Sequence, residues 1–222
     1  RGGSKGIPRK NIRKFAGKPL IAYTIEKCIN SQIFSHVIVS TEDNEIAMIS
    51  KKYGAEVPFM RPKKLATDQA GTSDVLIHGI KKLENLGYKF NEIVLRDCTV
   101  PFIRDDDVSK SLSKLPKKKS GAVFGVYRQH HNPYFNMMET NSQGYLQISK
   151  KVRTRPVARQ TSPIVYQLSG LWVLDTKQFL KYETILVPKI LPFEIPVETG
   201  FMIDTELEFK IAEFLACSNL IH

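Results

Sequence analysis

Cysteine is scarce in this 222-residue chain, and its placement excludes two kinds of small fold. The three cysteines, Cys28, Cys98 and Cys217, are far apart and odd in number, and none of them has C-x-x-C spacing. This argues against a zinc site and against a disulfide framework. It suits a reducing compartment, so a cytoplasmic location is expected.

Long apolar runs are also missing. No stretch approaches the roughly 20 apolar residues of a membrane span, so no membrane partner is expected. No signal peptide is visible, but the first residue is Arg1 rather than Met and no strand precedes the first loop. We therefore expect a short N-terminal strand to be missing from this sequence, which leaves a targeting segment open.

Acidic residues are few relative to basic ones, with 22 Asp and Glu against 33 Lys and Arg and a net charge of +11. Such a charge predicts acidic partners: a nucleotide, nucleic acid or an anionic surface. Nucleic acid would favour one concentrated basic face interleaved with aromatic residues. Here the lysines occur as scattered pairs, such as Lys51-Lys52 and Lys81-Lys82. We therefore expect a small anionic ligand and no nucleic acid.

Among the features that are present, the segment 1–11 (RGGSKGIPRKN) is the most informative. Its three glycines let the backbone approach a ligand closely, and free N–H groups in such a loop form an anion-binding concavity. Its four cations add the charge that a polyphosphate needs. The Walker A and G-x-G-x-x-G patterns are absent. The segment predicts a nucleotide-phosphate loop; the alternative is a flexible basic arm, such as an RGG-type RNA tail.

Apolar stretches alternate with helix-like patterns along the whole chain, whose hydrophobic fraction of 42% is ordinary for a globular protein. Helices are expected over 20–29, 46–53, 73–86 and 206–215, with a further one beginning at 105–107. Strands are expected over 36–41, 92–95, 122–127 and 166–174, with at most a brief edge strand over 57–59. This predicts one α/β domain over 1–222, with a doubly wound, mostly parallel, Rossmann-like sheet. Ligands bind such sheets beyond the carboxyl ends of the strands, where the segment 1–11 and the turns at Thr41 and Asp97 are expected.

The pattern changes between about residues 132 and 163. Two strand-like segments, 134–138 and 145–148, flank the turn-like Asn141-Ser142-Gln143-Gly144, which is typical of a hairpin. We interpret this region as a β-rich insertion that forms a lid or a dimerisation element. Gly170, inside the strand that follows, predicts close approach of a ligand or of another backbone.

Several blocks carry a resemblance to a known family. They are RGGSKGIPRKN (1–11), GKPLI (17–21), VST (39–41), RP (61–62) with LATD (65–68), HHNP (130–133), RQ (159–160) with Pro163, and IDTE (203–206). In this order they resemble the acylneuraminate (CMP-sialic acid synthetase-like) cytidylyltransferases over nearly the whole chain. That family transfers CMP from CTP to a sugar acid, releases pyrophosphate, requires Mg²⁺ and is typically a homodimer. The resemblance therefore implies a nucleotidyltransferase fold, CTP, a small acidic acceptor and Mg²⁺.

By this resemblance the first loop holds the triphosphate of CTP. The residues assigned to it are Arg1, Gly2, Gly3, Ser4, Lys5, Lys10 and Asn11. Backbone N–H groups of the Gly-Gly-Ser stretch would bind phosphate oxygens, and the cations would stabilise charge on the departing pyrophosphate, which places Arg1 and Lys10 in the catalytic group. The alternative for Lys10 and Asn11 is a solvated loop and a turn residue.

The segment 61–72 resembles the family's cytosine pocket. Arg61 and Thr72 would hydrogen-bond the pyrimidine, and the backbone of Ala70 would pack close to it. Recognition by hydrogen bonds is strongly selective, because a wrong base leaves buried polar groups unpaired. The alternative is an ordinary polar loop.

Asp97 and Asp204 are the predicted metal ligands and complete the catalytic group. Each follows an apolar run, and Mg²⁺ favours one or two carboxylates together with substrate oxygens and waters. The alternatives are a turn cap for Asp97 and the N-cap of the last helix for Asp204.

Two blocks depart from the sialic-type pattern. Residues 97–101 read DCTVP where QPTSP is usual, and residues 202–204 read MID where DID is usual. An acid is thus lost at Met202 and gained at Asp97, an arrangement that resembles the Kdo and methylerythritol-phosphate cytidylyltransferases. We therefore expect a metal site split across two strands. Because the missing Gln is associated with acceptor binding in sialic-type enzymes, the acceptor stays open.

The acceptor pocket is expected near the insertion and the strand after it. The candidates are Arg159, Gln160, Tyr166, Gln167 and Ser169. An Arg suits a carboxylate or a phosphonate through paired hydrogen bonds. Trp172 is expected in the core, and His130-His131 are expected to form a turn rather than to act in catalysis.

The sequence thus predicts transfer of CMP from CTP to an acidic sugar of the nonulosonic, sialic-type class. The acceptor could instead be a Kdo-like acid, a polyol phosphate or a phosphonate. The alternative from another class is a non-catalytic nucleotide- or RNA-binding homologue that lost its metal site through Met202. No general base stands out among the residues.

Overall fold

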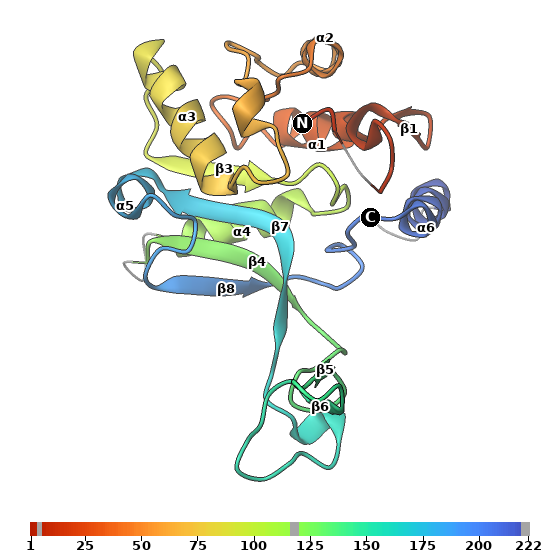
Figure 1. Ribbon diagram of the computed structural model, residues 1–222. Coiled ribbons are helices and arrows are strands. Elements are labelled where there is room, and N and C mark those ends of the chain that lie inside the picture. Colours follow the sequence, from red (N-terminus) through yellow and green to blue (C-terminus); the bar gives the residue numbers. More distant parts are fainter. Residues whose placement is uncertain (4–5, 116–119, 219–222) are drawn as a thin grey trace.

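The computed structural model describes residues 1–3, 6–115 and 120–218 and shows a layered body with one projecting arm (Figure 1). The arm is the part of the chain between the end of the strand Ala122–Arg128 and the start of the strand Tyr166–Asp175. The helices are α1 (Leu20–Asn30), α2 (Asn44–Lys52), α3 (Thr72–Asn85), α4 (Asp105–Lys114), α5 (Thr176–Tyr182) and α6 (Glu206–Cys217), with 3-10 turns η1 (Lys10–Ile12), η2 (Lys63–Leu65) and η4 (Arg159–Thr161). The strands are β1 (Lys14–Phe15), β2 (Lys18–Pro19), β3 (Glu92–Arg96), β4 (Ala122–Arg128), β5 (Met138–Thr140), β6 (Leu146–Ile148), β7 (Tyr166–Asp175) and β8 (Ile190–Glu194).

The central sheet has four strands in the order β3-β7-β4-β8. β3, β4 and β8 run in the same direction, and β7 runs antiparallel between β3 and β4. The sheet is therefore mixed, because β7 is the strand that returns from the arm into the body. The predicted α/β fold is confirmed, with three of the four strands parallel to one another.

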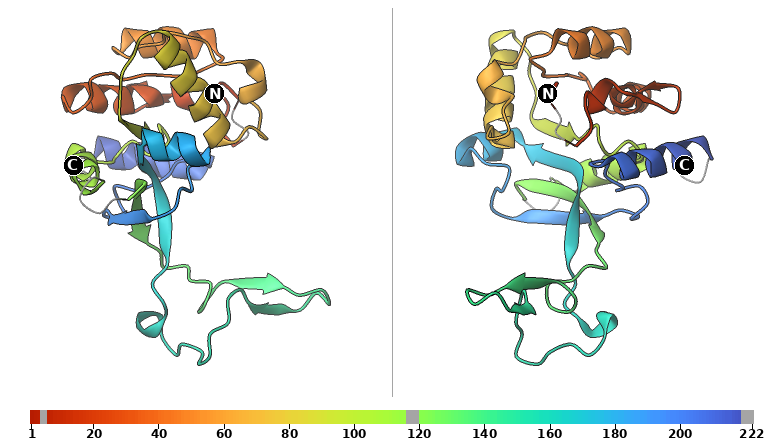
Figure 2. Two further views of the ribbon diagram at one scale, coloured as in Figure 1. Left: turned by 90° about the vertical axis from the view of Figure 1, so that its left-hand side faces the viewer. Right: turned by 45° about the vertical axis from the view of Figure 1, so that its right-hand side comes forward.

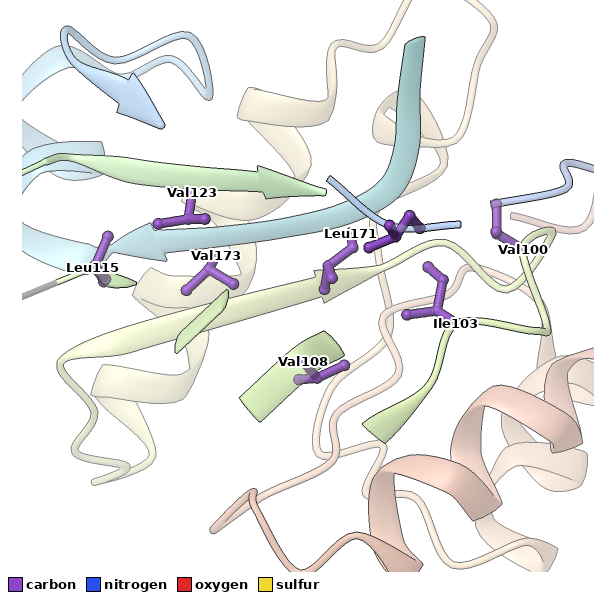
Figure 3. Packing of buried hydrophobic residues seen from close by; sticks show 8 residues of the cluster. Val100, Ile103, Val108, Leu115, Val123, Leu171 and Val173 are labelled. Atoms are coloured by element: carbon purple, nitrogen blue, oxygen red, sulfur yellow. The ribbon is translucent and has the colours of Figure 1, made fainter. Parts of the chain in front are cut away.

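Helices cover both faces of this sheet, as expected for a doubly wound fold. On one face α4 packs on Val123, Leu171 and Val173, and the side chains interdigitate in a single cluster (Figure 3). On the other face α3 and α5 pack on Phe124 and Leu174. Trp172 joins this second cluster and meets the Phe124 ring edge-on, so its predicted place in the core is confirmed.

A separate core fixes the N-terminal segment to the last helix. Ile7, Phe15 and Leu20 pack with Ile203 and with Phe209 of α6, and all five are buried. At the burial coefficient of about 25 cal/mol per Å² of apolar surface, each such side chain stabilises the contact by roughly 1.5–3 kcal/mol. The first and last parts of the chain therefore form one unit.

Most of the predicted helices and strands are confirmed, and glycines end two of the helices as expected. Gly54 and Gly87 follow the ends of α2 and α3 with φ of +97° and +87°, the left-handed conformation that ends a helix. The strand predicted over 36–41 is wrong. Ile38 forms one isolated parallel bridge with Glu56, and no strand forms over 57–59, where Pro58 lacks a backbone donor.

The arm contains a hairpin, as predicted, but the strand expected over 134–138 is wrong: residues 133–136 form a turn and the first strand is β5, whereas β6 lies within the predicted 145–148. β5 and β6 pair antiparallel, and Gly144 takes φ of +85° in the turn between them. The arm extends away from the body in both further views (Figure 2). Many of its apolar side chains are exposed: Met137, Met138, Tyr145, Leu146, Val157 and Ile164. Its role as a lid or a dimerisation element stays a prediction.

Candidate active site

The candidate site lies at the carboxyl end of β3, where two loops meet. Asp97 directly follows β3, and its backbone N–H donates to the carbonyl of Gly170 at 2.8 Å. Two residues on, the carbonyl of Thr99 accepts from Ile203 N–H at 3.0 Å. These bonds hold the turn after β3 between β7 and the segment before α6. Asp97 and Asp204 therefore lie on adjoining loops, as the split-site prediction requires.

Lys10 connects the glycine-rich segment to this place. Its side chain is 10% exposed, and Nζ donates to the carbonyl of Ile203 at 2.6 Å and to Asp204 Oδ1 at 3.0 Å. Gly6 lies against the backbone carbonyl of Asp204 so closely that a Cβ at this position would overlap it. The glycine thus serves backbone approach here, although to a neighbouring loop.

The side chain of Asn11 is also fixed at this place, by hydrogen bonds at both ends of its amide. Its Oδ1 accepts from the thiol of Cys98 at 3.2 Å, and its Nδ2 donates to the carbonyl of Arg1 at 3.2 Å. Burial raises the pKa of the Cys98 thiol to about 12, and the charge of Asp97 adds to this. The solvated-loop alternative therefore does not describe Lys10. Asn11 does lie in the 3-10 turn η1, as the turn-residue alternative has it, but its side chain also contacts Cys98 and Arg1.

The sequence did not predict a set of polar contacts that holds the first loop against α2. We call these contacts of Gly2 and Arg9 with Glu42, Asp43 and Glu45 the latch. Gly2 N–H donates to Glu42 Oε1 at 2.7 Å, and the guanidinium of Arg9 binds both Asp43 and Glu45. Asp43 also caps α2 by accepting from two backbone N–H groups, and its pKa falls to about 2, mainly through Arg9. An Asp immediately before a helical pattern is an N-cap signal that could have indicated half of this arrangement.

The predicted cytosine pocket adjoins the first loop. Arg1 pairs with Asp68 at 2.6 Å, and the Arg61 guanidinium donates to the carbonyl and the hydroxyl of Ser40. Burial lowers the pKa of Arg61. Thr72 is the exposed first residue of α3, and Ala70 N–H donates to the carbonyl of Thr67 at 3.3 Å. The structure thus brings the segment 61–72 to the first loop, with Arg61 oriented by Ser40.

The two predicted metal ligands differ in their surroundings. Asp97 Oδ1 accepts from the N–H and the hydroxyl of Thr99, at 3.1 and 2.9 Å, so the turn-cap alternative is realised there. The cap alternative for Asp204 is wrong, because Thr205 is the N-cap of α6 and forms a capping box with Glu208. The Asp204 carboxylate pairs with Lys10, and its side chain is 61% exposed.

The donor chemistry at this place fits Mg²⁺ only in combination with a substrate. Within residues 1–3, 6–115 and 120–218, no group of three or more His, Cys, Asp or Glu side chains could hold an ion. Two carboxylates on adjoining loops are, however, what Mg²⁺ takes from a protein when phosphate oxygens and water supply the remaining ligands.

The predicted acceptor residues are not gathered at Asp97. Gln167 hydrogen-bonds Gln129 at the base of the arm, and Tyr166 Oη lies 3.4 Å from Glu194 Oε2. Ser169 is fully buried. Arg159 and Gln160 belong to η4, and this segment lies on the arm (Figure 1). Arg159 Nη1 is 3.4 Å from Nδ1 of His130.

Gly170 explains how β7 passes the site. It takes φ of +72°, and a Cβ there would lie 2.8 Å from Cβ of Asp97. The close approach predicted for this glycine is therefore confirmed, and its neighbour is the turn that carries Asp97. Of the first-loop residues, Ser4 and Lys5 lie outside the described residues, and Gly3 is exposed. None of the described helices has the length and apolar character needed to cross a membrane.

This chain is similar to known cytidylyltransferases in sequence and in fold. A family model described as cytidylyltransferase matches residues 1–168. The pseudaminic acid cytidylyltransferase of Campylobacter jejuni is 33% identical over 220 residues, covering 97% of this chain and 92% of the relative. The CMP-N,N'-diacetyllegionaminic acid synthase of the same organism is 31% identical, with coverages of 97% and 91%. A CMP:2-keto-3-deoxy-manno-octonic acid synthetase complexed with CTP shares the fold, with a TM-score of 0.72 and 16% identity over 99% of this chain and 96% of the other. The chain therefore belongs to the cytidylyltransferase family and is a nucleotidyltransferase.

Proposed function

We propose that this enzyme transfers CMP from CTP to an acidic sugar of the nonulosonic class, with release of pyrophosphate. The observation that carries the proposal is the meeting of Lys10 with Asp204 beside the Asp97 turn, at the carboxyl end of β3. A cation and two carboxylates on adjoining loops suit a triphosphate and its counter-ion. The glycine-rich segment and the Arg61 segment adjoin the same place.

In this reaction an oxygen of the acceptor attacks the α-phosphorus of CTP in line. One oxygen–phosphorus bond forms, and the bond to the departing pyrophosphate breaks. Lys10 would neutralise charge that builds up on the phosphates, and the backbone N–H groups of the first loop would position them. No side chain needs to form a covalent bond, since positioning and electrostatics carry most of such a transfer. Asp97 and Asp204 would hold Mg²⁺, which supplies charge neutralisation when it is bound with CTP.

The acceptor class rests on the relatives, whose names give pseudaminic and diacetyllegionaminic acid. Both are acidic sugars, and the net charge of +11 favours anionic substrates. The second candidate is the same transfer to a Kdo-like acid, since Asp97 stands where sialic-type members have Gln.

We also propose that the enzyme is a homodimer assembled through its arm. Exposed apolar residues gather on a thin projection, where Tyr145 is 69% and Leu146 is 66% exposed. A surface of this kind is typical of a protein interface. Arg159 and Gln160 remain acceptor candidates if the arm reaches an active site, either by folding back or by contacting the body of a second copy. Three free cysteines are consistent with a cytoplasmic location.

The test is pyrophosphate release from each of the four nucleoside triphosphates with Mg²⁺. The acceptor panel contains pseudaminic, legionaminic and sialic acids, Kdo, a polyol phosphate and a phosphonate. Of the four nucleoside triphosphates, we expect only CTP to release pyrophosphate. Of the acceptors, we expect a nonulosonic acid to support this release. Release only with Kdo, the polyol phosphate or the phosphonate would replace the acceptor class but keep the reaction.

A non-catalytic homologue would behave differently in the same assay. It would bind CTP, measured by calorimetry, without releasing pyrophosphate for any acceptor. Restoring the missing acid with Met202→Asp would then separate a lost metal site from an untested acceptor. Salt-sensitive binding of single-stranded RNA would favour the nucleic-acid alternative instead.

A further inference from the structure

Two side-chain hydrogen bonds connect Cys98 to Asn11 and Asn11 to the backbone of Arg1, and we call this pair of bonds the relay. Cys98 Sγ donates to Asn11 Oδ1 at 3.2 Å, and Asn11 Nδ2 donates to the carbonyl of Arg1 at 3.2 Å. Asn11 follows Lys10 in η1, and Lys10 is bound by the neighbouring loop at Asp204. Two consecutive side chains of the first loop are therefore fixed by the two loops of the site.

The backbone that carries the thiol is held on both sides. Asp97 N–H donates to Gly170, Val100 N–H donates to the carbonyl of Asp97, and Thr99 accepts from Ile203. Asp97 Oδ1 also accepts from Thr99 within the turn. A donor in such a turn has little freedom, so the position of its partner is fixed as well.

The contact itself gives the direction of the hydrogen bond. Cys98 Sγ lies 3.2 Å from the side-chain oxygen of Asn11, and because that oxygen can only accept, the thiol S–H is the donor. An Asn amide has two distinct ends, and its hydrogen-bond partners decide which way it faces. The side-chain oxygen of Asn11 therefore faces Cys98, and its NH₂ group faces the backbone carbonyl of Arg1.

We propose that Cys98 is a positioning residue for CTP, which orients the Asn11 amide and through it the backbone at Arg1. The inference rests on the proposed function, in which the first loop holds the triphosphate. Its physical basis is pre-organisation: a loop already fixed in the binding conformation loses less entropy when the ligand binds. The thiol itself needs no contact with CTP.

The competing explanation is that Cys98 only fills space beside Ile21, Ile25 and the other apolar residues of that cluster. The two explanations predict different CTP affinities when the Cys98 thiol is replaced by the hydroxyl of serine. Serine keeps a donor and a similar shape but is more polar, whereas alanine removes the donor. Rescue by serine therefore indicates the hydrogen bond, whereas rescue by valine, which fills the space but has no donor, indicates packing.

The test compares Cys98→Ala, Cys98→Ser and Cys98→Val with the control Cys217→Ala, which removes an exposed cysteine far along the chain. For each variant, CTP affinity is measured by calorimetry, and KM for CTP and kcat by pyrophosphate release. Losing one weak hydrogen bond predicts a three- to tenfold weaker CTP affinity for Cys98→Ala, with kcat within about twofold. Cys98→Ser should stay close to the unchanged protein, and Cys217→Ala should match it.

The double variant Cys98→Ala with Asn11→Ala shows whether the effect passes through Asn11. If it does, the Cys98 substitution adds nothing once Asn11 is gone. Additive losses, or Cys98→Ser as weak as Cys98→Ala, would overturn the inference. If Asn11→Ala alone leaves CTP affinity unchanged, the proposed place of CTP fails rather than the relay.

The relay also has a readout without ligand. The side-chain NH₂ signals of Asn11 in a ¹⁵N NMR spectrum, assigned through the Asn11→Ala variant, should shift in Cys98→Ala and return towards their original place in Cys98→Ser. Unchanged signals in Cys98→Ala would contradict the hydrogen bond. Should Cys98→Ala not fold, Cys98→Val replaces it as the variant without a donor.

Discussion

Lys10 Nζ lies 3.0 Å from Asp204 Oδ1, so the cation of the first loop and the carboxylate before α6 neutralise each other. Only one of the two side chains is buried: Lys10 is 10% exposed and Asp204 is 61% exposed. In the proposed function Lys10 would bind a phosphate and Asp204 would bind the counter-ion. On that proposal the ion pair opens when the substrate binds, and the exposed Asp204 carboxylate is the side that the substrate reaches first.

Replacing Lys10 with methionine should separate its two roles. Lys10→Met keeps much of the buried stem but removes the charge and the donor to Ile203. Loss of one group that stabilises the transition state predicts a turnover about 10²–10³-fold lower. The Ile203 carbonyl loses a partner, at a cost of roughly 1–3 kcal/mol of unfolding free energy. Kinetics and urea unfolding measure the two effects, and the control is Lys14→Met at an exposed position. Turnover equal to that control would remove Lys10 from the reaction.

Asp204→Asn should affect activity far more than stability. The carboxylate is 61% exposed and Thr205 rather than Asp204 caps α6, so the unfolding free energy should change by less than about 1 kcal/mol. If Asp204 holds the metal, turnover should fall by about 10²-fold or more. Asp106→Asn, which also removes an exposed carboxylate next to a lysine, is the matched control. Near-normal turnover of the Asp204 variant would contradict the metal role.

The sequence predicts the body of this fold better than its active-site contacts. Periodicity locates helices such as α1, because a helix repeats every 3.6 residues regardless of its neighbours. The segment 36–41 has the same local strand pattern as β4, yet it forms only the bridge at Ile38, since a strand also needs a partner in register. Contacts such as Cys98 with Asn11 join residues 87 positions apart, and nothing in the local pattern encodes them.

Gly170→Ala should disturb the turn that carries Asp97. The new Cβ would lie 2.8 Å from Cβ of Asp97 and 2.9 Å from Cγ2 of Val100, at a residue with φ of +72°. Gly144→Ala is the control, because its φ is +85° and nothing lies within 4 Å of the added carbon. Both variants lose about 1–2 kcal/mol from the left-handed backbone. The overlap should cost Gly170→Ala a further 1–3 kcal/mol or so in thermal unfolding, together with lower activity. Equal losses in the two variants would show that the turn tolerates the methyl group.

Gly6→Ala should separate the first loop from the segment before α6. An added Cβ would overlap the carbonyl of Asp204, which belongs to backbone and cannot rotate away. Gly3→Ala adds the same group where no atom lies within 4 Å. We expect Gly6→Ala to lose roughly 1–3 kcal/mol of stability, with Gly3→Ala within about 0.5 kcal/mol of the unchanged protein. A fully stable Gly6→Ala would mean that the two segments can move apart without cost.

The latch of the first loop on α2 predicts how stability depends on pH. Arg9 lowers the pKa of Asp43 from 3.8 to about 2, so the folded protein holds this carboxyl group ionised more strongly than the unfolded chain does. The contribution is complete above the unfolded value and is lost as the pH falls from 3.8 towards 2. Asp43→Asn keeps a side chain that caps helices well but removes the charge. The variant should be about 1–2 kcal/mol less stable near neutral pH, a figure reduced because Arg9 is partly exposed.

Urea unfolding of Asp43→Asn and the unchanged protein over an acidic pH series measures this difference. The gap in unfolding free energy should narrow as the pH drops through the range in which Asp43 takes up its proton. Glu45→Gln is the comparison, because Glu45 also pairs with Arg9 but is 61% exposed and does not cap α2. Its effect should be smaller, since an exposed ion pair contributes about 0–1 kcal/mol. A constant gap for Asp43→Asn at every pH would show that the variant loses packing or capping, and that the charge pair with Arg9 does not hold the first loop on α2.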